Sequence, residues 1–253
     1  MYRALMTRCR TASWGGADIH RGRRGEEKDE IPVEVEDGRQ RMNGTWMVAS
    51  AAGALAGAAA TPWLTTHGLA QLARIDAAGP GLALASAVAG GGAGAAAIVT
   101  SHRAETWWLV PALLVWGCAL VAAASCDAVT QRIPTPLVRQ AAVGTGVLLT
   151  VGLAVHGDWR GVLVSGVAAA AAGAVLLLCW RFAGAGFGDV RLAVLGGLGL
   201  GHATHRGLLL ALAAFSLIIV TQAVVTLMRD GDRRGTFPYG PALAAGFLLA
   251  ATL

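Results

Sequence analysis

The sequence predicts an all-α fold, a polytopic membrane helix bundle of about six to eight transmembrane segments, on three observations. Hydrophobic residues make up 55% of the 253 positions, and charged residues only 14%. The mean hydropathy is +0.57. Several apolar stretches approach the roughly 20 residues that a helix needs to cross a bilayer. Together these observations favour a multi-pass membrane protein over a water-soluble domain.

The first 43 residues differ in composition from the rest. They hold nine Lys/Arg and eight Asp/Glu, whereas everything after them holds eleven Arg and seven acidic residues. Because residues 1–43 mix both charge signs and lack apolar periodicity, we expect a disordered polar tail before a membrane domain over 44–253. The tail is not a cleavable secretory signal, since no small-residue cleavage site follows a short apolar core. A start at Met42 or Met47 is an alternative reading of this composition.

Eight apolar segments follow the tail. The first two are weakly hydrophobic and rich in Ala and Gly, and the sixth and eighth are short, so each of these four either spans the membrane or is re-entrant or packed. Six of the eight Trp residues fall at segment ends, where amphipathic rings favour the headgroup region. The segments cover approximately 44–62, 80–99, 107–126, 137–155, 161–180, 190–201, 207–228 and 240–253.

Loop arginines predict the orientation. Loops 127–139, 181–191 and 229–236 carry seven arginines, and the intervening loops 156–160 and 202–206 carry two. Basic loops stay in the cytoplasm, so the first group is expected there. Eight full crossings would then put the basic tail outside, which the same rule disfavours. Three features would each remove that conflict: the nearly equal numbers of positive and negative charges in the tail, a re-entrant first segment, or a later start of the chain.

Two aspartates lie at segment ends on this predicted cytoplasmic side. Asp127 closes the third segment and Asp189 opens the sixth, 62 residues and two crossings later. An ionisable side chain at a membrane-helix end is by default a functional-site hypothesis. Two carboxylates at matching depth can share one proton, because repulsion and partial desolvation disfavour two charges. Such a pair supplies one base and one acid, the arrangement that activates water in aspartic proteases.

The residues beside each aspartate support a site. Ile133-Pro134 follows Asp127 and predicts an extended backbone before the next helix. Gly186 and Gly188 precede Asp189 and leave an uncrowded approach for a substrate backbone. Small residues then recur every four positions, which permits the close helix packing that would bring Asp189 inward. This small-residue stripe consists of Ala193, Gly197 and Gly201.

Three of these stretches resemble the prepilin peptidase family, the type IV leader peptidases among the GxGD membrane aspartyl proteases. The first is Asp127 with Arg132-Ile133-Pro134, and the second is Gly186-Phe187-Gly188-Asp189-Val190-Arg191-Leu192. The third is Phe237-Pro238-Tyr239-Gly240-Pro241. They span about 127–245, roughly half of the chain, in the family's order and spacing. One GxGD is a weak signal, whereas all three together are fairly specific.

The resemblance implies a peptidase core at about 107–253 with Asp127 and Asp189 as the catalytic pair. It implies removal of a short basic leader from pilin-like precursors at the cytoplasmic face, before a hydrophobic helix. Two positions depart from the family's pattern. Thr135 stands where Asn or Asp is common, and Arg191 where Lys is common. Both keep hydrogen-bonding or charge character, so they bear on substrate preference more than on the reaction.

The cysteines bear on a second activity of the family. Cys9, Cys118, Cys126 and Cys179 form no C-x-x-C pair, and therefore no zinc-knuckle or evident disulfide pattern. Many relatives carry a C-x-x-C domain between their first two spans, associated with N-methylation. The 63–79 loop is too short for it. The resemblance is therefore to a short form without methyltransferase activity, some members of which serve Tad-type (Flp) pili.

Other readings of these residues stay open. Either aspartate could cap a helix or occupy a first turn favoured by the helix dipole. Carboxylates beside glycine-broken helices also build proton- or cation-coupled transporters, although we find no inverted repeat. A catalytically dead membrane scaffold is a third reading. His202 and His205 have a ligand-like spacing but lack a third ligand, which favours a solvated loop.

We therefore predict an aspartic-type endopeptidase in the cell membrane, with its active site facing the cytoplasm. It needs no cofactor and no metal. Its expected partners are prepilin-like precursor peptides and the lipid bilayer, without nucleic acid. Arg132 and Arg191 are expected to be membrane-interface anchors. The residues expected to bind substrate or shape the site are Gly186, Gly188, Ile133, Pro134, Pro238 and Gly240.

Overall fold

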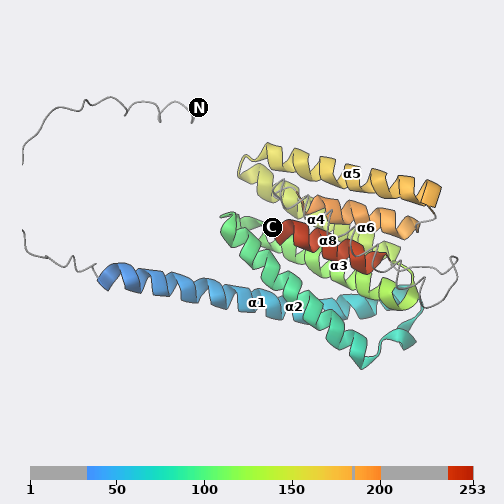
Figure 1. The fold of residues 1–253 in the computed structure, drawn as a ribbon, viewed down its shortest axis with the longest axis horizontal. Helices are drawn as coiled ribbons and strands as arrows, with labels where there is room; N and C mark the ends of the chain where they lie inside the picture. The colour runs from blue at the N-terminus through green and yellow to red at the C-terminus, as the bar shows by residue number, and fades with distance from the viewer. Residues whose placement is uncertain (1–32, 184–185, 201–238, 253) are drawn as a thin grey trace, which may run out of the picture. The chain divides into compact units, whose positions relative to one another are not determined.

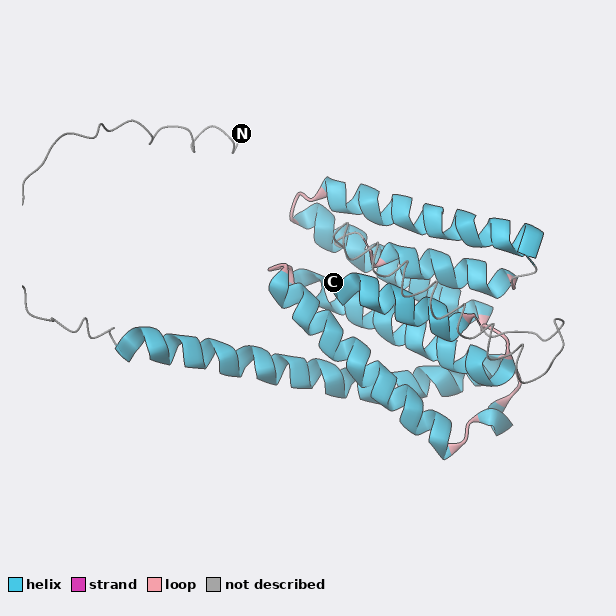
Figure 2. Ribbon diagram, viewed as in Figure 1, coloured by secondary structure: helices cyan, strands magenta, loops and turns pink. Residues whose placement is uncertain are grey.

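A computed structural model describes residues 33–183, 186–200 and 239–252, and all regular secondary structure in them is helical. These ranges hold no strand, and their elements follow one another as coiled ribbons in Figures 1 and 2. The predicted all-α class is confirmed. The elements are α1 (Val33–Gln71), η1 (Ile75–Ala77), α2 (Pro80–Arg103), η2 (Trp107–Leu109), α3 (Val110–Thr130), α4 (Thr135–Val155), α5 (Trp159–Ala183), α6 (Phe187–Leu198) and α8 (Gly240–Thr252).

Five of these helices are long and apolar enough to cross a membrane, which makes this a multi-pass membrane protein. Two further predicted segments are short, because α6 has 12 residues and α8 has 13. At about 1.5 Å per residue neither reaches across a hydrocarbon core of about 30 Å. The predicted segment 207–228 lies outside the described residues. The five candidate spans are Thr45–Gln71, Pro80–Arg103, Trp107–Thr130, Thr135–Val155 and Trp159–Arg181.

Helix α1 is longer at both ends than the predicted segment 44–62. It begins at Val33, inside the range 1–43 expected to be a disordered tail, because extending an existing helix costs far less than nucleating one. It also continues through Pro62. Near the proline, the Thr61 hydroxyl donates to the Gly57 carbonyl over 2.7 Å, and the Thr65 hydroxyl donates to the Thr61 carbonyl over 2.9 Å. These bonds keep carbonyls of this stretch paired, and the predicted boundary at 62 is wrong.

The chain divides into two compact units, 1–41 and 42–253, and the rest of this description concerns the second. Helix α3 is its central element and contacts α2, α4, α6 and α8. In its apolar window 72% of residues are buried, against 17% to 33% in the other four spans. The Trp116 indole N–H of α3 donates to the Leu195 carbonyl of α6 over 2.9 Å. This bond links the two helices that carry the aspartates.

Glycines allow the close helix contacts on both sides of this core. A Cβ at Gly197 of α6 would lie 2.6 Å from the Ala168 carbonyl oxygen of α5, so the α5 backbone occupies that space. This confirms the predicted close packing at Gly197, whereas Gly201 lies outside the described residues. On the other side, the weakly hydrophobic α1 and α2 meet backbone to backbone at Gly57 and Gly90. Small residues thus compensate in packing for what these helices lack in hydrophobicity.

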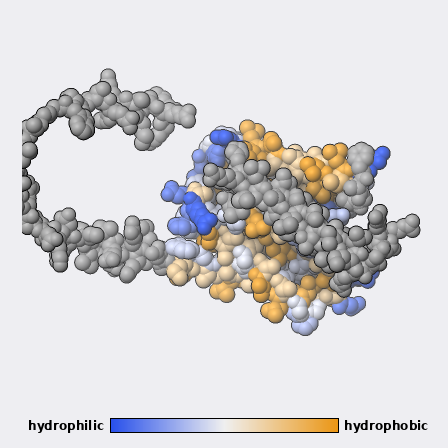
Figure 3. All heavy atoms as spheres, viewed as in Figure 1, coloured by the Kyte–Doolittle hydropathy of each residue, from blue (hydrophilic) through white to orange (hydrophobic). Residues whose placement is uncertain are grey.

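The surface of this unit carries many exposed apolar side chains. Val88, Leu163 and Val167 are each more than 65% exposed. On the face drawn in Figure 3, hydrophobic residues cover the sides of the helices and hydrophilic residues gather near the helix ends. Exposed apolar surface of this kind is expected where lipid is the solvent.

Candidate active site

Asp127 lies in the last turns of α3 and is only 5% exposed. The helix ends three residues later, where Gln131 adopts a left-handed φ of 53° and donates its N–H to the Asp127 carbonyl over 2.8 Å. The side chain takes no such local role. Its Oδ2 accepts the backbone N–H of Gly240 over 2.9 Å. The reading of Asp127 as a simple local cap does not describe this contact, because its partner is 113 residues away.

Gly240 is the first residue of α8 and approaches Asp127 closely. A Cβ at this position would lie 2.8 Å from Oδ2 and 2.9 Å from Cβ of Asp127. If residue 240 had a side chain, either Asp127 or the start of α8 would have to move. This explains in steric terms why a glycine suits the position, which was expected to shape the site.

Asp189 is the third residue of α6 and is 6% exposed. Its Oδ2 accepts the N–H of Gly186 over 3.0 Å, and its own N–H donates to the Gly186 carbonyl over 3.1 Å. These two bonds start the helix in the manner of a capping box, with backbone replacing the usual N-cap side chain. Asp189 thus does have the first-turn structural role that was one alternative, and this role holds the carboxylate in one orientation.

The loop that follows α3, the helix of Asp127, packs against the start of α6, the helix of Asp189. Ile133 contacts the start of α6, where a Cβ at Gly188 would lie 3.0 Å from the Ile133 Cβ. Asp189 lies outside the five long apolar helices. Burial raises the pKa of its carboxyl group to about 6, and the negative charge of Asp127 adds to the rise, while the bond from Gly186 opposes it. The two carboxyl groups are therefore close enough for an electrostatic interaction.

The backbone between Asp127 and α4 is extended, as Ile133-Pro134 predicts. Pro134 has φ −69° and ψ 102° and is the residue before the first residue of α4. Its side chain is fully buried, and Ile133 is half-buried. Ile133 therefore packs next to Asp189, beside Gly188, whereas Pro134 packs near Gly68 of α1. Of the other residues expected here, Gly186, Gly188 and Gly240 also lie beside an aspartate or its loop, whereas Pro238 lies outside the described residues.

One contact next to the site was not expected from the sequence. The Arg191 guanidinium of α6 donates to the Thr135 hydroxyl of α4 and lies 4.8 Å from the ring centre of Phe187. These are the two positions that depart from the family's pattern. Arg191 was expected to be a membrane-interface anchor, and the structure adds that it ties α4 to α6. A single sequence contains no signal for this pairing.

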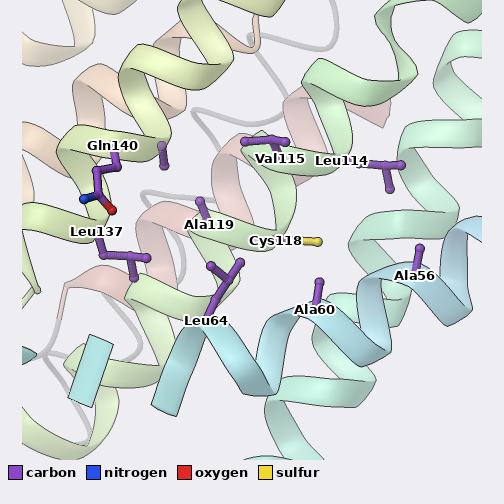
Figure 4. Close-up of a pocket in the computed structure, with 10 residues that line it drawn as sticks. Ala56, Ala60, Leu64, Leu114, Val115, Cys118, Ala119, Leu137 and Gln140 are labelled. Atoms are coloured by element: carbon purple, nitrogen blue, oxygen red, sulfur yellow. The ribbon is translucent and has the colours of Figure 1, made fainter. Parts of the chain in front are cut away.

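The described residues include no group of three or more His, Cys, Asp or Glu side chains placed to hold a metal ion. His202 and His205 lie outside those residues. A cavity of about 350 Å³ lies between α1, α3 and α4, where Leu64, Cys118 and Gln140 are among its lining (Figure 4). Neither aspartate lines this cavity. Asp127 and Asp189 are both buried, and the negative charge of Asp127 acts on Asp189.

Comparison of the chain with protein families, with curated proteins and with solved structures finds no match.

Proposed function

We propose that this protein is a membrane aspartyl endopeptidase that removes the basic leader from prepilin-like precursors at the cytoplasmic face of the cell membrane. The observation that carries the proposal is the burial of Asp127 and Asp189, two carboxylates from distant parts of the chain that interact electrostatically. Burying two interacting carboxyl groups lowers the free energy of unfolding. Such pairs therefore occur mainly where they serve a function.

The proposed mechanism follows from one proton held by two carboxyl groups. The ionised aspartate takes a proton from a water molecule, whose oxygen attacks the scissile carbonyl carbon. The protonated aspartate donates its proton to the carbonyl oxygen, which gives a tetrahedral diol. Collapse of the diol breaks the C–N bond as the leaving nitrogen gains a proton from one aspartate and a diol hydroxyl gives its proton to the other, which restores the singly protonated pair. The two bonds from Gly186 and Gly240 would hold the carboxylates in place through these steps.

Three features support a leader peptidase within this class. The motif around Asp189 and the Ile133-Pro134 loop resemble the prepilin peptidases. Arg132 and Arg139 lie at the same end of the bundle as Asp127, which supports a cytoplasmic site. The connection between α1 and α2 runs only from residue 72 to residue 79, too short for a C-x-x-C domain, which supports cleavage without N-methylation.

A proton- or cation-coupled transporter is the second candidate. A buried carboxyl group whose pKa is raised to about 6, as at Asp189, can also bind and release a transported proton. The two candidates differ in a measurable way. A transporter moves protons across sealed liposomes in the absence of any peptide, whereas the peptidase shortens a precursor in detergent, where no gradient exists.

The test uses the purified full chain in liposomes with a synthetic precursor that has a basic leader, a Gly and an apolar helix of about 20 residues. Wild type should shorten the precursor, and Asp127→Ala and Asp189→Ala should each leave it intact. Asp76→Ala is the matched control, because Asp76 is an exposed aspartate on the connection between α1 and α2. It should cleave at the wild-type rate.

Mass spectrometry of the product's new N-terminus reports the scissile bond and any added methyl group. A normal cleavage rate in either active-site variant would disprove the catalytic pair. Proton flux that needs both aspartates, without cleavage, would establish the transporter instead.

A further inference from the structure

A groove lies between α4 and α6 on the side of α6 away from the aspartates. Its volume is about 410 Å³. On α6 it is lined by residues 187, 190, 191 and 194, which share one helix face. At about 100° per residue, Asp189 points roughly 100° or more away from this face. The groove is therefore on a different face of α6 from Asp189.

The lining of the groove is partly basic and partly apolar. Arg139 and Arg191 lie about one turn into α4 and α6, near Thr135, and the apolar wall consists of Val138, Ala142, Phe187, Val190 and Val194. The groove thus combines a basic mouth with an apolar wall. Because the mouth lies where a candidate span begins, it is at the level of the lipid headgroups.

The basic mouth has unused hydrogen-bonding capacity. Arg139 is exposed and makes no ion pair or hydrogen bond with the part of the chain that the structure describes. Arg191 is held by Thr135 and Phe187, but a guanidinium has five N–H donors and the bond to Thr135 uses one of them. No acidic side chain lines the groove. Two positive charges therefore face an open space without a described counter-charge.

We infer that this groove binds one anionic phospholipid, with its phosphodiester on Arg139 and Arg191 and an acyl chain along Val138, Val190 and Val194. Basic pockets between membrane helices on the cytoplasmic side suit such headgroups. The apolar wall suits a hydrocarbon chain. A small free anion would leave this wall without a partner. A basic leader peptide would be repelled by the two arginines. The inference does not depend on the proposed peptidase activity.

The experiment measures phospholipid binding by native mass spectrometry of the full chain in detergent. The probes are phosphatidylglycerol and phosphatidylcholine with identical acyl chains. Wild type should retain phosphatidylglycerol in preference to phosphatidylcholine. Arg139→Gln should weaken phosphatidylglycerol binding about fivefold, since one basic residue near a membrane surface contributes about that much. The control is Arg132→Gln, an exposed arginine on the connection from α3 to α4 that does not line the groove.

A second variant tests the acyl-chain part of the site. Ala142 is half-buried on the apolar wall, and Ala142→Trp would fill the space while keeping both arginines. It should weaken phosphatidylglycerol binding as much as Arg139→Gln or more. Equal binding in wild type and Arg139→Gln would overturn the inference. Inorganic phosphate that competes fully, together with no effect of Ala142→Trp, would show a free-anion site instead. Loss of precursor-peptide binding in Ala142→Trp, with lipid binding unchanged, would show a peptide groove.

Discussion

The end of α3 and the start of α6 hold their aspartates by different means. Asp189 accepts a hydrogen bond from a residue three positions earlier, within the same helix start. Asp127 accepts one from Gly240, 113 positions later, at the start of α8. One carboxylate is therefore oriented by local backbone geometry and the other by tertiary packing. Disturbing the packing of α8 should affect Asp127 far more than Asp189.

The largest expected effect comes from Gly240→Ala. The added Cβ would lie 2.8 Å from the Asp127 Oδ2, so the carboxylate or the start of α8 must shift. A misplacement of about 1 Å at a catalytic group costs about 100-fold in rate, and we expect a loss of that order in precursor cleavage. The measurement is the initial cleavage rate in liposomes.

Gly186→Ala is the matched variant on the other side. Its Cβ would approach the Asp189 Oδ2 only to 3.1 Å, a distance that a small adjustment can relieve. We expect a loss several-fold smaller than for Gly240→Ala. Equal losses in the two variants would contradict the distinction between a locally held and a tertiary-held aspartate.

A medium effect is expected on the proton affinity of Asp189. Cleavage requires one proton on the pair, and the pKa of Asp189 is raised to about 6. The cleavage rate should therefore fall as the pH rises through about 6. Asp127→Asn removes a neighbouring negative charge, so it should lower the pKa of Asp189. Desolvation, the larger cause, remains, and the pKa should stay above its ordinary value.

That shift can be measured without activity. Carbodiimides modify protonated carboxyl groups, and peptide mass spectrometry gives the pH at which Asp189 is half-modified. This pH should be lower in Asp127→Asn than in wild type and unchanged in the exposed control Asp76→Asn. An unchanged value in Asp127→Asn would show that the two carboxylates do not interact.

The smallest effect concerns the link between the two helices. Trp116→Phe removes the indole N–H that donates to the Leu195 carbonyl. We expect a loss of at least about 1 kcal/mol in the free energy of unfolding, because the variant loses one hydrogen bond and also part of a buried ring. The measurement is unfolding in mixed detergent and SDS. Trp159→Phe is the control, because Trp159 is 63% exposed at the start of α5. Identical midpoints for both variants would show that this bond does not stabilise the pairing of α3 with α6.

Local patterns predicted the parts of the fold that depend on local physics. Hydrophobic runs near membrane length predicted the long spans, and Ile133-Pro134 predicted the extended entry to α4. Helix boundaries were less predictable. α1 continues through Pro62, where it packs closely on α2, and this tertiary packing is not visible in a hydropathy profile.

The sequence alone determined that this is a membrane protein, because hydrophobicity is a property of residue types. It also placed two carboxylates at the ends of apolar segments. It offered a first-turn role for Asp189 as one reading, and the bond from Gly186, three positions earlier, gives Asp189 that role. Only the tertiary structure decided that Gly240 binds Asp127, that Ile133 lies against Gly188 and that Arg191 pairs with Thr135. Those contacts join residues tens to more than a hundred positions apart, and their existence depends on how whole helices pack.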